Sequence, residues 1–131
     1  MKEVTREWLV AALDDLKTIS HLENDDALTH ILAFHAQQCI EKSLKAIIEE
    51  KELGALKIHN LRCLFGLCEK QLAINEADKD LIAVLDSLYL NARYPGERGL
   101  LPDGKPTLAE AKEYGVFAKR IHDQTSEVLK S

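Results

Sequence analysis

The 131-residue chain has few aromatic residues, few turn-forming residues and no long apolar run. Aromatic side chains make up 5% of the sequence against 46% hydrophobic residues, which favours aliphatic helix packing over an aromatic-rich β-structure. Six Gly and three Pro leave little room for the turns of a sandwich or barrel. No apolar run approaches the roughly 20 residues that a membrane span needs, and no signal peptide opens the chain. We expect one soluble, cytoplasmic, all-α domain over residues 1–131.

Cysteine frameworks and metal motifs are also missing. Cys39, Cys63 and Cys68 are odd in number and lack CxxC spacing, so they indicate small buried residues in a reducing compartment. There is no H-E-x-x-H motif, and His30 and His35 lie about 140° apart on a helix, too far to share a metal ion. No Ser-His-Asp or Cys-His arrangement and no glycine-rich phosphate loop can be assembled. We expect no metal and no cofactor, and the net charge of −5 confines any nucleic-acid contact to a local patch.

Helical periodicity predicts an antiparallel up-and-down bundle of about five helices. The predicted helices span about 5–22, then from a cap at 24–26 to about 53, then 61–72, then from a cap at Asn75 to about Arg93, and finally onward from a Thr107–Glu110 capping box. Asn60 is the expected cap of the third helix, and Pro95 ends the fourth because it disfavours helical geometry at the preceding residue. Residues 94–106 hold three Gly and all three Pro, so they form a long loop before the last helix.

The second predicted helix has one apolar face and one mixed face. Steps of about 100° per residue place one set of side chains in an arc of roughly 160°. This expected core face comprises Leu28, Leu32, Ala33, Ala36, Cys39, Ile40, Ser43, Leu44 and Ile47. The opposite arc is polar but also contains Ile31, Phe34 and Ile48.

Apolar side chains within a polar strip are typical of a subunit contact with a hydrogen-bonding surround. We therefore expect a homodimer whose interface includes Ile31, Phe34, His35, Gln38, Glu41, Lys42 and Lys45. Alternatively, Phe34 packs inside its own chain, beneath the 94–106 loop or against another helix. Glu41 and Lys45 have an equally simple alternative role, as an i,i+4 ion pair on one helix.

The end of the fourth predicted helix is the best candidate for ligand binding. Arg93 and Arg98 flank Tyr94, and this combination can hold a phosphate and stack a base. His59, just before the third helix, is a further candidate for contact with nucleotide or RNA. The alternatives are structural: Arg93 satisfies carbonyls at the helix end and pairs with a nearby carboxylate, and His59 orders a turn.

Three segments in a fixed order give the chain a family resemblance. They are Phe34-His35-Ala36-Gln37-Gln38-Cys39-Ile40-Glu41-Lys42-Ser43-Leu44-Lys45-Ala46, His59-Asn60-Leu61 and Arg93-Tyr94-Pro95. Together with a Trp-containing first helix, they resemble the HEPN domain over nearly the whole chain. The resemblance implies a helical bundle that dimerises. It also implies frequent pairing with a minimal nucleotidyltransferase, in modules similar to toxin–antitoxin systems.

Many HEPN proteins are metal-independent ribonucleases, but this chain departs from the motif that they use. Their R-x4-6-H motif brings Arg and His together across the dimer. RNA cleavage without metal needs a group that moves the 2′-hydroxyl proton and cations that stabilise the phosphorane. The permitted positions after Arg93 hold Arg98, Gly99 and Leu100. The resemblance thus favours a binding and assembly module with no catalytic residues; the alternative is a ribonuclease toxin with a substitute base such as His59.

Overall fold

The computed structural model describes residues 1–54, 57–93 and 104–130, and this part of the chain forms five helices and no strand. They are α1 (Glu3–Leu22), α2 (Thr29–Lys51), α3 (Leu61–Cys68), α4 (Glu76–Arg93) and α5 (Leu108–Val128). The predicted all-α fold is confirmed. Among the described helices, none is long and apolar enough to cross a membrane.

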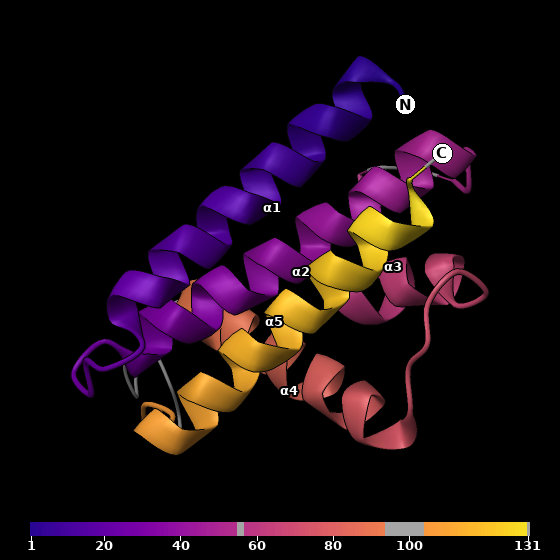
Figure 1. The fold of residues 1–131 in the computed structure, drawn as a ribbon. Coiled ribbons are helices and arrows are strands. Elements are labelled where there is room, and N and C mark those ends of the chain that lie inside the picture. The colour runs from indigo at the N-terminus through magenta and orange to yellow at the C-terminus, as the bar shows by residue number, and fades with distance from the viewer. Residues whose placement is uncertain (55–56, 94–103, 131) are drawn as a thin grey trace.

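Helix α2 is the centre of the bundle, and each of the other four helices packs on it (Figure 1). Its predicted core face is buried at every position except Leu28, which is 36% exposed because it precedes the helix as its N-cap residue. Aliphatic side chains of α3, α4 and α5 complete the core, with Phe117 as its largest fully buried residue. Aliphatic packing on one central helix therefore accounts for the architecture.

Most of the predicted helix caps are present. Asn60 and Asn75 each accept a hydrogen bond from the backbone N–H three residues ahead, at 3.1 and 2.9 Å. Thr107 and Glu110 form the predicted capping box, with bonds of 3.1 and 2.9 Å. These contacts satisfy N–H groups that a helix end would otherwise leave without partners.

Two predicted helix boundaries are wrong. The cap at 24–26 does not start α2, because the Asp25 carboxylate instead accepts the N–H of Ala27 in a turn and the helix begins at Thr29. Helix α3 ends at Cys68, four residues before the predicted end at Leu72. In both places a local turn takes up the backbone groups that the longer helix would have used.

A bidentate ion pair joins α4 to α5. The Arg120 guanidinium donates two hydrogen bonds to the Asp78 carboxylate, one of them at 3.0 Å. Asp78 is buried, whereas the Arg120 side chain is 43% exposed. These hydrogen bonds hold the pKa of Asp78 below its ordinary value, and the Asn75 N–H contributes further. The pair thus stabilises the fold in its ionised form.

Replacing Arg120 with Gln should lower the free energy of unfolding by about 1–3 kcal/mol, because the buried Asp78 carboxylate loses its charged donor. In the native protein, the lowered pKa of Asp78 gives stability that is fully present above the unfolded pKa of about 3.9 and is lost as pH falls through the folded pKa. In the variant, the pKa of Asp78 in the folded state should lie closer to the unfolded value, so the acid-side loss should be smaller and complete at a higher pH. Urea unfolding from about pH 2 to pH 7 measures both effects.

The control for this experiment is Lys119→Gln, which removes an exposed i,i+4 pair with Asp123 on the same helix. Such surface pairs contribute roughly 0–1 kcal/mol. Equal losses in the two variants would contradict a special role for the buried carboxylate.

Candidate functional site

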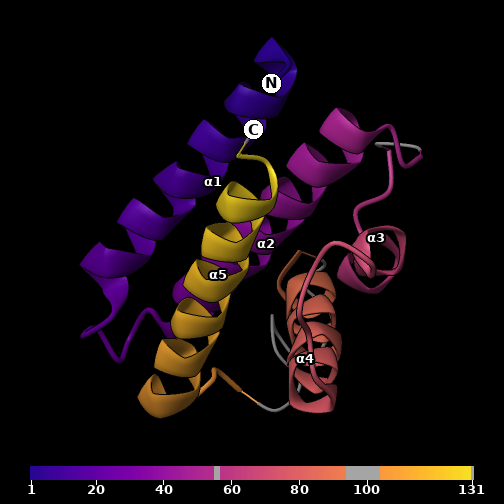
Figure 2. The same cartoon turned by 45° about the vertical axis from the view of Figure 1, so that its right-hand side comes forward.

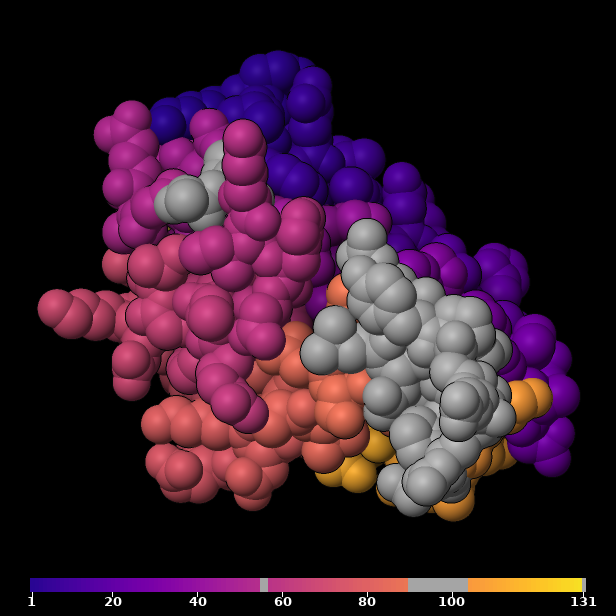
Figure 3. All heavy atoms as spheres, turned by 180° about the vertical axis from the view of Figure 1, so that it is seen from behind, coloured from indigo at the N-terminus to yellow at the C-terminus, as the bar shows by residue number. Residues whose placement is uncertain are grey.

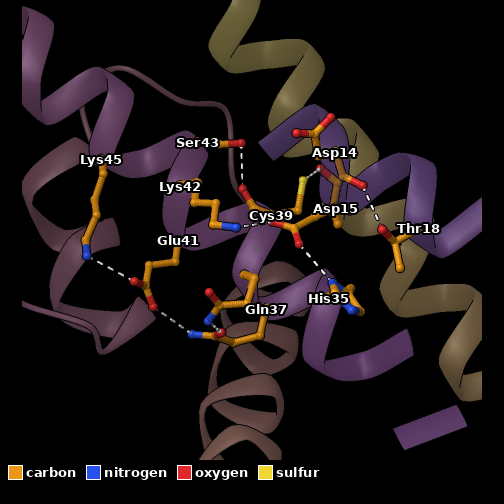
Figure 4. Close-up of polar contacts among 12 residues, drawn as sticks. Asp14, Asp15, Thr18, His35, Gln37, Cys39, Glu41, Lys42, Ser43 and Lys45 are labelled. Atoms are coloured by element: carbon orange, nitrogen blue, oxygen red, sulfur yellow. Dashed lines mark hydrogen bonds and ion pairs between the residues drawn. The ribbon is translucent and has the colours of Figure 1, made fainter. Parts of the chain in front are cut away.

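The polar side chains of α2 form two clusters on either side of the helix (Figure 4). The Asp15 cluster consists of Asp15 on α1 with His35 and Lys42 on α2. The Asp15 carboxylate is buried and contacts His35 Nδ1 at 2.9 Å and Lys42 Nζ at 2.8 Å. His35 and Lys42 are each 25% exposed, so one edge of the cluster reaches the surface.

The Glu41 cluster is a chain of hydrogen bonds through Gln38, Gln37, Glu41, Lys45 and His59. Gln38 donates to Gln37 at 2.7 Å, and Gln37 donates to Glu41 at 3.2 Å. Lys45 Nζ donates to the second Glu41 oxygen at 3.0 Å, and His59 Nδ1 lies 3.2 Å from the same oxygen. The Glu41 and Lys45 side chains are 8% and 3% exposed, whereas His59 is 60% exposed.

The expectation of a polar surface strip on α2 is therefore wrong for Gln37, Glu41 and Lys45, which are buried inside this chain. Figure 3 shows the face of the molecule that α3 and α4 form over α2. The α1 side chain Trp8 also approaches Lys45, whose Nζ lies 5.3 Å from the ring centroid. Glu41 and Lys45 do form the i,i+4 ion pair of the simpler alternative, but the pair lies in the interior of the chain.

Phe34 and Ile31 differ from those residues because each remains 37% exposed. Phe34 stacks on Tyr89 of α4, with ring centroids 5.8 Å apart, and meets the His35 ring edge-on at 5.3 Å. It thus packs against another helix of its own chain and still presents surface to the outside. We call Ile31, Phe34 and Tyr89 the aromatic patch.

The predicted arginine site lies mostly outside the described residues. Helix α4 ends at Arg93, as predicted, but its side chain and the residues Tyr94 and Arg98 fall in the part that is not described. Asp86, a nearby carboxylate on α4, accepts the backbone N–H groups of Leu61 and its neighbour at 2.8 and 3.1 Å. Asp86 therefore caps α3.

Sequence patterns did not identify Asp15 and Asp86 as structural partners. Asp15 lies on the buried face of α1 with Ala12 and Ile19. A single carboxylate on an apolar face was the feature that could have indicated a buried ion pair. Asp86 follows the buried Leu85 on α4 and could be assigned only once α3 was placed beside it.

Cysteine and metal chemistry find little support in the described residues. Cys39 and Cys68 are buried as expected, and burial raises the pKa of each thiol to about 12, which keeps both protonated. Cys63 is exposed on α3, contrary to expectation, because it lies on the helix face away from α2. Within the described part, no group of three or more His, Cys, Asp or Glu residues could hold a metal ion.

Comparison with known proteins assigns most of the chain to one family. The model of the HEPN domain matches residues 5–128. The crystal structure of an archaeal HEPN homologue covers 99% of this chain and 100% of its own, with a TM-score of 0.73 and 24% sequence identity. At that identity the likeness supports the fold alone. No curated protein matches the chain.

Replacing Glu41 with Gln should destabilise the bundle by roughly 3 kcal/mol, because the buried Lys45 ammonium loses its counter-charge. Removing both charges together, with Glu41→Leu and Lys45→Met, should cost less than Glu41→Gln because no buried charge is left unpaired. Chemical unfolding followed by circular dichroism measures both. Glu49→Gln, on the same helix and without an ion pair among the described residues, is the control; a loss there as large as in Glu41→Gln would contradict this account.

Proposed function

Because the chain belongs to the HEPN family, we propose that it is a homodimeric binding and assembly module, and not a ribonuclease. The observation that carries this proposal is the absence of histidine from the three positions after Arg93 that an R-x4-6-H motif allows. Without that residue, the motif lacks the group that would move the 2′-hydroxyl proton. The arginine alone is suited to holding an anion.

The aromatic patch supports dimerisation. Ile31 and Phe34 are both exposed apolar side chains and lie among polar ones, which resembles an interface core with a polar rim. His35 and Lys42 reach the surface on the same helix and can supply that rim. Gln38 is partly exposed beside them. Glu41 and Lys45 are buried and paired with each other, so neither side chain reaches the surface. They remain interface candidates only because they support the adjoining surface of α2.

The proposed ligand is an anionic nucleotide or RNA, bound near Arg93, Tyr94 and Arg98. Helix α4 carries Arg93 one turn beyond Tyr89, so the proposed ligand site adjoins the proposed subunit contact. Two guanidinium groups with an aromatic ring between them suit a phosphate and a base. His59, exposed and beside α3, is a further candidate contact.

The proposed protein partner is a minimal nucleotidyltransferase, in a cytoplasmic module similar to a toxin–antitoxin pair. This part of the proposal is supported by the family resemblance of the Arg93-Tyr94-Pro95 branch. A nucleotidyltransferase reading frame beside this one, whose product co-purifies with this chain, would support it. The absence of such a frame would weaken it.

One contact favours the alternative of a ribonuclease toxin. His59 is 60% exposed, and the buried Glu41 carboxylate lies 3.2 Å from its Nδ1. The Lys45 ammonium lies at the same distance from this nitrogen. In the tautomer whose Nδ1 proton is donated to Glu41, the other ring nitrogen is free to accept a proton, as in hydrolases that use a His–acid pair. His59 is therefore the substitute base that the ribonuclease reading would require.

Replacing Ile31 and Phe34 together with Lys should convert the dimer to a folded monomer, because two ammonium groups cannot be desolvated in an apolar contact. Light scattering measures the mass, and circular dichroism confirms helicity. The control is Val10→Lys with Val116→Lys, at side chains 59% and 69% exposed on α1 and α5. A dimer that survives the first pair but not the control would assign the contact to α1 and α5.

The single variants Arg93→Ala and Arg98→Ala should each bind ATP or a short RNA about tenfold more weakly. That is the loss expected for one charge-assisted contact. The affinity of the unmodified protein should fall as salt rises. Calorimetric titration measures both, with Lys130→Ala as the control for removing a cation elsewhere.

The same RNA should remain intact during these titrations, with or without magnesium. Cleavage that both Arg93→Ala and His59→Ala abolish would replace the proposed function with the ribonuclease alternative.

A further inference from the structure

Helices α1 and α5 both pack on α2 (Figure 2). They approach each other closely where the end of α1 meets the start of α5, because Gly115 of α5 lies against Ile19 of α1. A groove of about 690 Å³ lies on the surface between the end of α1 and the start of α5. That volume falls within the range of about 300–1,000 Å³ typical of small-molecule sites.

The floor and walls of the groove are mostly apolar. Their apolar part comprises Leu13, Leu16, Ile19, Leu32, Gly115 and Val116. Gly115 lets the two helices approach at the floor, because a β-carbon there would lie 3.1 Å from Cγ2 of Ile19 and 3.8 Å from a methyl of Leu32. Leu13 and Val116 form the edges, at 41% and 69% exposed.

The charged groups at the mouth are not balanced. Lys17 and Lys112 line the groove and have no ion pair among the described residues, whereas Lys119 is paired with Asp123 at 2.7 Å. Glu23 is the remaining acidic side chain of the lining. Two uncompensated cations thus face one uncompensated carboxylate.

We propose that this groove binds a small amphiphilic carboxylate, with its apolar chain between Leu13 and Val116 and its head group at Lys17 and Lys112. The apolar walls and the excess of cations at the mouth each match one half of such a molecule. A protein segment is a poorer match, because protein contacts bury about 800 Å² per partner around a desolvated core. Here only Leu13 and Val116 present substantial apolar surface. The site is separate from the aromatic patch and does not depend on the proposed function.

Octanoate is the test ligand, added to the full-length protein and followed by amide chemical shifts in NMR spectra. Saturable shifts confined to residues 13–24 and 112–123 are expected. Octan-1-ol should bind there more weakly, and octyltrimethylammonium weaker still. No saturable shift, shifts centred elsewhere, or equal affinity for the carboxylate and the ammonium would overturn the proposal.

Two variants separate the contributions of charge and shape. Lys17→Gln with Lys112→Gln should weaken octanoate binding about fivefold and leave octan-1-ol unchanged, as expected for two exposed ion pairs. Val116→Glu should weaken both ligands, and its 69% exposure makes it compatible with the fold. Lys70→Gln, which removes an exposed cation in the turn after α3, is the matched control. Octanoate affinity that is unchanged in the Lys17→Gln, Lys112→Gln variant, or that falls as much in Lys70→Gln, would overturn the assignment of the head group.

Discussion

The structure depends on the burial of two carboxylates, Asp15 and Glu41, against cationic groups on the central helix. A buried carboxylate is costly unless a charged partner and hydrogen bonds compensate for lost water. Asp15 meets His35 and Lys42, while Glu41 meets Lys45 and hydrogen bonds from its neighbours. Asp15 lies on α1, and His59, which contacts Glu41, lies in the segment before α3. Both carboxylates therefore keep their partners only when α1 and this segment occupy their observed positions on α2.

This constraint decides what the central helix can offer to a partner. Its most conspicuous charges are used inside the chain, so they are not available as a docking strip. Around Phe34, the surface that remains consists of Ile31 and Phe34 with the edges of His35, Gln38 and Lys42. The outward chemistry of this part of α2 is therefore an apolar pair surrounded by polar and cationic groups. The groove between α1 and α5 has the same character on a different face, although α2 contributes only Leu32 there.

The sequence was sufficient for the bundle and for most of its caps, because apolar periodicity and capping side chains act within one helix. Asn60, Asn75 and Thr107 could be identified from neighbouring residues alone. The fate of Glu41 could not, since a carboxylate on the polar arc of a helix looks the same whether water or another helix covers it. Only the position of the segment before α3, which brings His59 to Glu41, distinguishes these cases, and the periodicity of a single sequence does not contain it. The burial of Asp15 on α1 could not be predicted for the same reason, because it depends on where α2 lies.

The contacts of Asp15 also fix the register of α1 along α2. A slip by one helical turn, about 5.4 Å, could bring one aliphatic layer against the next and preserve much of the apolar burial. It would, however, carry Asp15 away from His35 and Lys42 and leave its carboxylate buried without a counter-charge, at a cost of several kcal/mol. In a bundle with so few aromatic side chains, interlocking ring shapes provide little discrimination between layers. One polar contact thus selects a single alignment that aliphatic packing alone would leave degenerate.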